Sequence, residues 1–444
     1  RRLKTLKKLY YFAAMGEGQT MANRKLKVSA MAENLIGSEI IKLAGEVNER
    51  MKRGEKIYNL TIGDFDPKIF PIPQELEQEI INAYKNNETN YPAANGIESL
   101  RKAAQHFVGS HNGLKYDTDE FLIAGGGRPL IYATYITLLD KGDKVIYPVP
   151  SWNNNHYTHL SFCEKIEVET QPENNFMPTA AEIAPHIQEA TLIALCSPLN
   201  PTGTAFSKSA LAEICDLVVA ENKRRSPDQK PLYILYDQLY WTLTFGETHH
   251  YDPVSLRPEL RDYVIYIDGL SKAFSATGVR VGWSFGPKYI IDKMKSILSH
   301  IGAWAPKAEQ VAAAKYLMDD AAINRFLTEY KQQIQNRLEG FYQGIQSLKN
   351  KGYHVDCIAP QSAIYLTVKC DLRGAIKPDG NNINSMADVA AYLLNDAHIA
   401  LVPFYAFGSD KESPWFRLSV GTCSMDDVNG SIASLENALG QLKW

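Results

Sequence analysis

An α/β fold with a large, mainly parallel sheet domain and a smaller α+β domain is what this sequence predicts. Short apolar runs recur between Ile57 and Ile267, and longer stretches with helical spacing separate them. The runs are continuous rather than alternating, which is typical of parallel strands that are buried on both faces. The chain has 444 residues, about three times the length of a typical single domain of ~150 residues, so we expect more than one domain.

The first residues differ from the rest of the chain. Five basic residues lie within positions 1–8, and the short apolar run 9–14 follows them. A transit peptide or weak signal peptide could have this pattern, but the run is too short for a convincing signal core. Because Met15 and Met21 are both plausible starts, we interpret residues 1–29 as a leader or disordered tail and leave them out of the fold.

The predicted elements follow in chain order. Residues 35–53 have the apolar spacing of a helix, and residues 57–62 form a short strand. Residues 310–345 read as a long polar helix, residues 222–231 as a solvated loop, and Val428–Leu442 as the last helix. Five further apolar runs predict the strands of the large sheet: 121–124, 144–147, 192–196, 232–236 and 263–267. We therefore expect an N-terminal arm with part of the small domain over 30–69, a large domain over 70–310 and a small C-terminal domain over 311–444.

Composition narrows the classes of function. The chain has 47 basic and 50 acidic residues, which argues against the broadly basic surface of a nucleic-acid binder. No apolar run is long enough to predict a membrane span. The six cysteines lie far apart, without CxxC spacing or a His/Cys cluster, so we expect no metal site and a reducing, cytoplasmic location.

Candidate ligand-binding residues follow the predicted strands, where parallel sheets place their ligands. Gly125-Gly126-Gly127-Arg128 precedes a predicted helix and is either a phosphate-binding turn or a plain tight turn. The GxGxxG pattern of dinucleotide-binding folds is not met, because Leu130 stands at the position of its last glycine. This departure argues against a nicotinamide dehydrogenase.

The loops after the next strands carry further polar groups. Taken alone, Asn200 is only a turn residue and Asp237 only a helix cap, but Lys272 at the end of a buried strand is unusual, because a buried ammonium is costly. A lysine can form a Schiff base, and a carboxylate can pair with a pyridinium nitrogen. Together with Tyr240, Arg280 and the glycines, these groups predict a site for pyridoxal 5'-phosphate.

Three motifs resemble one family closely. They are Ser-Pro-Leu-Asn-Pro-Thr-Gly at 197–203, Tyr-Asp-Gln-Leu-Tyr at 236–240 and Ser-Lys-Ala-Phe-Ser-Ala-Thr-Gly-Val-Arg-Val-Gly at 271–282. Their order and spacing resemble the class I/II aminotransferases of pyridoxal-phosphate fold type I, and aspartate aminotransferases in particular. The resemblance covers about residues 30–440.

The resemblance implies catalytic and cofactor-binding roles. Lys272 would form the Schiff base and move the proton, and Asp237 would keep the pyridine nitrogen protonated. Asn200 and Tyr240 would hydrogen-bond the phenolic oxygen of the cofactor. The remaining cofactor-binding residues would be Trp152, stacked on the ring, and the phosphate-binding residues Gly126, Gly127, Arg128, Arg280 and, from the neighbouring subunit, Tyr91.

Substrate binding and assembly are implied in the same way. Arg417 would clamp the α-carboxylate of the substrate, with help from Asn200 and the Gly63 backbone. The position of Tyr91 in the family implies a homodimer with shared active sites. The sequence departs from many relatives at Gly269, where they carry Ser or Thr, and at Phe404, where they carry Gly. Ser271 precedes the lysine and receives no role.

An aminotransferase that uses small amino acids and 2-oxo acids is therefore the expected function. Arg128 occupies the place where one aspartate aminotransferase subgroup reads the distal carboxylate with a lysine, so aspartate or glutamate is the favoured donor. Alternatively, Arg128 only neutralises phosphate. Aromatic donors are the second expectation, given Tyr157, Phe404 and Tyr405 nearby. A lyase or synthase of the same fold is a further alternative.

Overall fold

A seven-stranded sheet forms the framework of residues 121–285. The computed structural model describes residues 26–35, 37 and 39–444. The strands lie in the order β2-β8-β7-β6-β5-β3-β4, and all neighbours run parallel except β8, which is antiparallel to β2 and β7. This mainly parallel sheet confirms the predicted fold class. The strands are β2 (Phe121–Ala124), β3 (Lys144–Val149), β4 (Glu164–Glu169), β5 (Ala190–Cys196), β6 (Tyr233–Asp237), β7 (Val264–Gly269) and β8 (Gly282–Phe285).

All five strands predicted between 121 and 267 are present, whereas β4 and β8 were not predicted. Strand β4 has the sequence Glu-Lys-Ile-Glu-Val-Glu, and only Val168 in it is fully buried. It lies at the edge of the sheet and pairs only with β3. Its exposed positions therefore tolerate charged side chains, and its sequence lacks the continuous apolar run by which five other strands were predicted.

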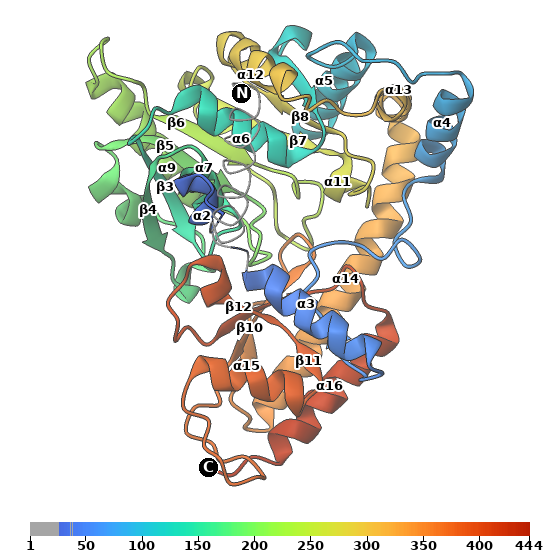
Figure 1. The fold of residues 1–444 in the computed structure, drawn as a ribbon, viewed down its shortest axis with the longest axis vertical. Helices are drawn as coiled ribbons and strands as arrows, with labels where there is room; N and C mark the ends of the chain where they lie inside the picture. Colours follow the sequence, from blue (N-terminus) through green and yellow to red (C-terminus); the bar gives the residue numbers. More distant parts are fainter. Residues whose placement is uncertain (1–25, 36, 38) are drawn as a thin grey trace, which may run out of the picture. The chain divides into compact units, whose positions relative to one another are not determined.

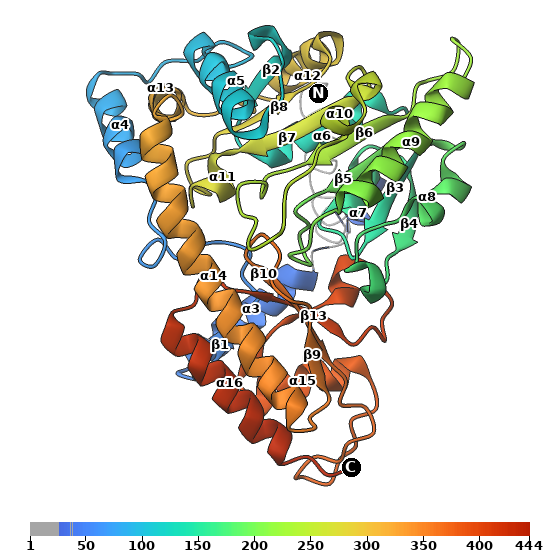
Figure 2. The same cartoon turned by 180° about the vertical axis from the view of Figure 1, so that it is seen from behind.

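Helices cover both faces of this sheet, as Figures 1 and 2 show from opposite sides. Side chains alternate between the faces along each strand, so Leu122 packs with α6 (Gly127–Leu138) and α12 (Lys288–His300), whereas Ile123 packs with the helices of the other face. Fully burying one such aliphatic side chain stabilises the fold by about 1.5–3 kcal/mol. The helices of the second face are α5 (Glu98–Asn112), α9 (Lys208–Arg224) and α13 (Lys307–Tyr316), next to α4 (Gln74–Lys85).

A four-stranded antiparallel sheet, in the order β12-β13-β10-β9, lies in the C-terminal third. Its strands are β9 (Val355–Cys357), β10 (Tyr365–Cys370), β12 (Val402–Pro403) and β13 (Trp415–Ser419), and α16 (Met425–Gly440) and α15 (Met386–Asn395) belong to the same core. Strand β1 (Tyr58–Asn59), which follows α3 (Glu39–Lys52), pairs in parallel with β11 (Ile399–Ala400). This pairing joins the segment after α3 to the C-terminal third, and the division into 30–69, 70–310 and 311–444 stays a prediction.

The predicted helix over 310–345 is two helices in the structure. Helix α13 ends at Tyr316, and α14 (Asp320–Asn350) begins after a three-residue break. The break has a local cause, because the Asp319 side chain accepts a hydrogen bond from the Ala322 N–H and caps the new helix. Figure 2 shows α14 running from the region of the seven-stranded sheet to that of the four-stranded sheet.

Residues 37–444 form one compact unit, and residues 1–36 form another. In the second unit the structure describes α2 (Ala30–Glu33), which Ser29 caps at its N-terminus. The leader predicted over 1–29 lies mostly outside the described residues. In the described part of the chain, no helix is long and apolar enough to cross a membrane. The remaining short helices are α7 (Asn154–Leu160), α8 (Ala180–Ile183), α10 (Pro253–Leu256) and α11 (Leu270–Ala273).

Candidate active site

The register of the large sheet brings the ends of several strands together. Cys196 at the end of β5 pairs with Asp237 at the end of β6. On the other side of β7, Gly269 pairs with Gly282, the first residue of β8, and Gly282 also pairs with Ala124 of β2. The loops that were predicted to carry the ligand-binding residues therefore start from one edge of the sheet.

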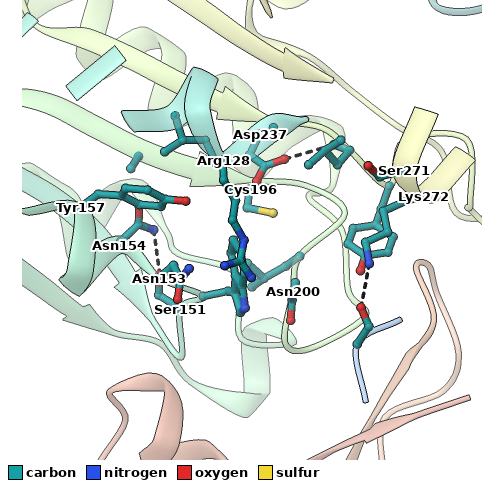
Figure 3. A pocket seen from close by; sticks show the side chains of 18 of the residues that line it. Arg128, Ser151, Asn153, Asn154, Tyr157, Cys196, Asn200, Asp237, Ser271 and Lys272 are labelled. Atoms are coloured by element: carbon teal, nitrogen blue, oxygen red, sulfur yellow. Dashed lines mark hydrogen bonds between the residues drawn. The ribbon is translucent and has the colours of Figure 1, made fainter. Parts of the chain in front are cut away.

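A cavity of about 420 Å³ lies at this edge (Figure 3). Most of the predicted site residues line it, although they come from segments as far apart as residues 63 and 417. Tyr91 and Gly126 are not among the lining residues. The predicted residues that do line the cavity are Gly63, Gly127, Arg128, Trp152, Asn200, Asp237, Tyr240, Lys272, Arg280 and Arg417.

Lys272 lies in the single-turn helix α11, directly after the buried strand β7. Its Nζ atom donates a hydrogen bond to the Gly63 carbonyl oxygen at 2.7 Å and lies 5.6 Å from the centre of the Tyr240 ring. The pKa of this ammonium is lowered to about 8, mainly by burial; the charge of Asp64 opposes the shift, and the charges of Arg417, Arg128 and Arg280 add to it. A substantial fraction of the Lys272 side chain is therefore a neutral, nucleophilic amine near pH 8.

Two carboxylates line the cavity, Asp64, which accepts from Thr277, and Asp237. One of the Asp237 oxygens accepts a hydrogen bond from the Leu239 N–H at 3.1 Å. Burial raises the pKa of Asp237 to about 6, while the Leu239 hydrogen bond and the charge of Lys272 act in the opposite direction. Above pH 6 the group is mainly ionised, so it can accept a hydrogen bond from a protonated nitrogen of a ligand in the cavity.

Arg417 is a buried guanidinium that no carboxylate of the described residues neutralises. It is 2% exposed, and burial lowers its pKa. Its Nη2 donates to the Thr61 carbonyl at 2.6 Å, and its Nη1 donates to Asn200 Oδ1 at 3.0 Å. Its Nε has no hydrogen-bond partner in the described part of the chain. Such a group is suited to an incoming carboxylate.

Two tyrosines support this arginine. The Arg417 guanidinium lies 4.7 Å from the centre of the Tyr365 ring. The Tyr365 hydroxyl lies 2.7 Å from the Tyr240 hydroxyl, and both residues are buried. Tyr240 is thereby held on the cavity wall beside Lys272, with its hydroxyl in a fixed place.

The glycine turn and Arg280 form the other end of the site. Arg280 donates to the Thr277 carbonyl and to the Gly125 carbonyl, both at 2.7 Å. Gly126 has φ +100°, and a Cβ atom added to it would collide with the Arg280 guanidinium, so only glycine suits this turn. Helix α6 begins at Gly127, and its N-terminus together with Arg280 is a suitable place for a phosphate group.

Arg128 and Trp152 stack on one wall of the cavity. The guanidinium carbon lies 4.6 Å from the centre of the indole ring. Figure 3 shows Arg128 extending into the middle of the site. Tyr91, in contrast, is 82% exposed, and its ring packs against Trp304 at 5.2 Å between ring centres.

The departures from the family pattern have physical explanations. A Cβ atom on Gly269 would lie 2.9 Å from Gly282 Cα and 3.0 Å from the Val281 carbonyl oxygen, so Ser or Thr has no room there. Ser271 lines the cavity beside Lys272 (Figure 3). Phe404 is fully buried against Phe176 and does not line the cavity.

Some lining residues were missed by sequence reasoning. Thr277, whose hydroxyl donates to Asp64 at 2.6 Å, lies inside the lysine motif and could have been found there. Tyr365 looks like any core aromatic in a strand, so its sequence carries no signal. Cys196 and Ile40 were read only as apolar residues of a strand and a helix.

Comparisons with known proteins agree with this geometry. The family model "Aminotransferase class I and II" matches residues 55–435. An aspartate aminotransferase of Rhizobium meliloti is 29% identical over 87% of the chain and 90% of its own length. A probable aspartate/prephenate aminotransferase of Rickettsia bellii is 30% identical over 89% and 94%. The crystal structure of the Rhizobium meliloti aspartate aminotransferase superposes with a TM-score of 0.86 at 26% identity, over 94% of this chain and all of that one.

Proposed function

The chain belongs to the class I and II aminotransferase family, and on that premise we propose that it moves the amino group of aspartate or glutamate to a 2-oxo acid, with pyridoxal 5'-phosphate as cofactor. The single observation that carries the proposal is the cavity in which Lys272, Asp237 and Arg417 meet. The aspartate-related names of the relatives support the choice of donor.

The residues of the cavity suit this cofactor. Its phosphate would lie at the start of α6 near Gly127 and Arg280, where the helix N-terminus favours an anion. Asp237 would hold the proton on the pyridine nitrogen, and Asn200 and Tyr240 would hydrogen-bond the phenolic oxygen. When bound, pyridoxal phosphate supplies an aldehyde for attachment of amines and a ring that accepts electrons.

Lys272 would supply the amine and then the proton transfer. Its lowered pKa, about 8, lets one nitrogen accept and return a proton near neutral pH. In the absence of substrate, the hydrogen bond from its Nζ to the Gly63 carbonyl oxygen holds the amine beside the Tyr240 ring. Tyr330 donates to the Lys272 carbonyl at 3.0 Å and fixes the backbone of this turn.

Two arginines would read the substrate. Arg417, with its unpaired Nε and its bond to Asn200, would bind the α-carboxylate. Arg128, held on Trp152, would bind the distal carboxylate of an acidic amino acid. Aromatic donors are the second candidate, favoured by the Tyr157 ring, which lines the cavity.

A homodimer with shared sites completes the proposal. The exposed Tyr91 ring lies outside its own cavity, which suits a role in the site of a neighbouring subunit. A cytoplasmic location is part of the same proposal, and the six free cysteines support it.

The test is an assay with aspartate and 2-oxoglutarate in the presence of pyridoxal phosphate. Formation of glutamate together with oxaloacetate supports transamination of an acidic donor. Glutamate formed from phenylalanine but not from aspartate would favour the aromatic alternative. Loss of aspartate without any glutamate would point to a lyase or synthase and contradict the proposal.

A further inference from the structure

A second cavity, of about 530 Å³, lies away from the active site. Its walls come from the C-terminal end of α5, the segment 241–250 and one side of α14. It shares no lining residue with the first cavity. The residues that line it are His111, Asn112, Trp241, Thr242, Thr244, His249, His250, Asn324, Leu327, Thr328, Lys331, Gln332 and Gln335.

The lining of this cavity contains a lysine but no acidic residue. Lys331 makes no ion pair or hydrogen bond with any described residue. The Lys331 side chain is half-buried on α14, and burial lowers its pKa. Two acids contact residues of the lining or its surroundings, and both already have partners: Asp320 accepts from His106 at 3.2 Å and from His111 at 3.1 Å, and Asp268 accepts from Trp241 at 2.9 Å. An ammonium group in this setting lacks the partner that usually offsets its desolvation.

Three neutral groups of the lining are also unpaired. Thr242 is 7% exposed, and its hydroxyl has no hydrogen-bond partner in the described part of the chain. The Asn112 Nδ2 and the His250 Nδ1 are unpaired in the same sense. The other ring nitrogen, Nε2, donates to Gln238 Oε1 at 3.2 Å, which holds the ring and leaves Nδ1 as a hydrogen-bond acceptor. Buried polar groups are normally hydrogen-bonded, so the unpaired donors of Thr242 and Asn112 favour a polar occupant over an apolar one.

From these observations we infer that this second cavity binds a small oxyanion, a phosphate or carboxylate group of a metabolite. The oxyanion would pair with the Lys331 ammonium and accept hydrogen bonds from the Thr242 hydroxyl and the Asn112 amide. Both kinds of oxyanion share this chemistry, because each offers several acceptor oxygens around one negative centre.

The walls of the second cavity also contact the active site. Trp241 follows Tyr240 in the chain, and its indole N–H donates to the buried Asp268 at 2.9 Å. Lys331 follows Tyr330, which donates to the Lys272 carbonyl. Residues of the second cavity therefore directly follow in the chain one residue that lines the active site and one that contacts Lys272, although the two cavities share no lining residue.

Calorimetric titration tests the inference. The purified protein is first saturated with pyridoxal phosphate, so that the phosphate end of the first cavity is filled, and is then titrated with inorganic phosphate and separately with citrate. We expect saturable heat with at least one probe, and the probe that binds identifies the oxyanion as phosphate or carboxylate. Lys331→Gln should weaken that binding at least about 10-fold, in line with the loss of a charged hydrogen bond.

Two further variants separate a binding role from a structural one. Lys349→Gln changes a lysine of the same helix that is already paired with Asp356 at 2.7 Å, and it should bind the probe as the unmodified chain does. Thr242→Val keeps the shape of the side chain, removes the unpaired hydroxyl and should weaken binding by several-fold. The inference is overturned if neither probe binds, or if Lys331→Gln binds as tightly as Lys349→Gln.

Discussion

The Lys272 ammonium donates a hydrogen bond of 2.7 Å to the carbonyl oxygen of Gly63, a residue 209 positions earlier in the chain. Gly63 is the last of three successive residues whose carbonyls accept from the core of the site. Thr61 accepts from Arg417 at 2.6 Å, and Ile62 accepts from Ser419 at the same distance. Residues 61–63 thus contact both the proposed catalytic amine and the proposed carboxylate-binding arginine, so a shift of this segment would move both groups.

Arg128→Ala should raise KM for aspartate far more than KM for alanine. Loss of a charged hydrogen bond costs about 1.5–3 kcal/mol, which corresponds to about 10- to 150-fold for aspartate. Alanine has no distal carboxylate, so its KM should change by less than about 3-fold on the same reasoning. Steady-state kinetics with both donors check this, and equal changes for both would show that Arg128 serves the phosphate instead.

Tyr91 variants test the shared site by complementation. Tyr91→Ala keeps Lys272 but should have reduced activity, whereas Lys272→Ala should be inactive. In a mixed dimer, one site combines the intact Lys272 of one subunit with the intact Tyr91 of the other. Mixing the two variants, with exchange of subunits, should therefore raise activity above that of Tyr91→Ala alone. Activity that only falls with dilution by the inactive variant would argue against a shared site.

Asp268 predicts a pH dependence of stability. The carboxyl group is fully buried between the Trp241 N–H at 2.9 Å and the Gly269 N–H at 2.7 Å. Burial raises its pKa from 3.8 to about 8, so the folded state holds this proton while the unfolded state has lost it. The free energy of unfolding should then fall as pH rises from 4 to 8, by at most about 1.4 kcal/mol for each pH unit.

The variant Asp268→Asn removes this ionisation, so its stability should fall less steeply than that of the unmodified chain between pH 5 and pH 8. Urea unfolding of the cofactor-free protein at several pH values measures the difference. The control is Asp262→Asn, which changes an exposed acid just before β7 and should leave the slope unchanged. Parallel slopes for Asp268→Asn and the unmodified chain would show that Asp268 ionises normally.

The sequence predicts the centre of the fold better than its edges. Strands β5 and β7 are buried on both faces, so their continuous apolar runs are visible in the sequence. Strand β4 lies at the edge of the sheet with exposed charges, and the break between α13 and α14 depends on one capping contact of Asp319. Neither feature produces a strong periodic signal.

The candidate site shows the same contrast. Asp237 and Lys272 follow buried strands directly, so their convergence follows from the parallel sheet. Arg417 and Tyr365 belong to the four-stranded sheet, and only tertiary packing brings them to the cavity. Arg417 was found through its resemblance to a family motif, while Tyr365 had no such motif. The lack of room at Gly269 depends on the approach of Gly282 and could not be read from either sequence segment.

Attachment of the cofactor at Lys272 is the central claim, and the absorption spectrum of the purified protein with borohydride treatment tests it most directly. We expect a visible band from bound pyridoxal phosphate, its removal by borohydride and a mass addition on the peptide that contains Lys272. Lys272→Ala should lose the covalent addition and reduce turnover by at least about 100-fold. A colourless protein that takes up no added pyridoxal phosphate, or a mass addition on a different lysine, would contradict the account.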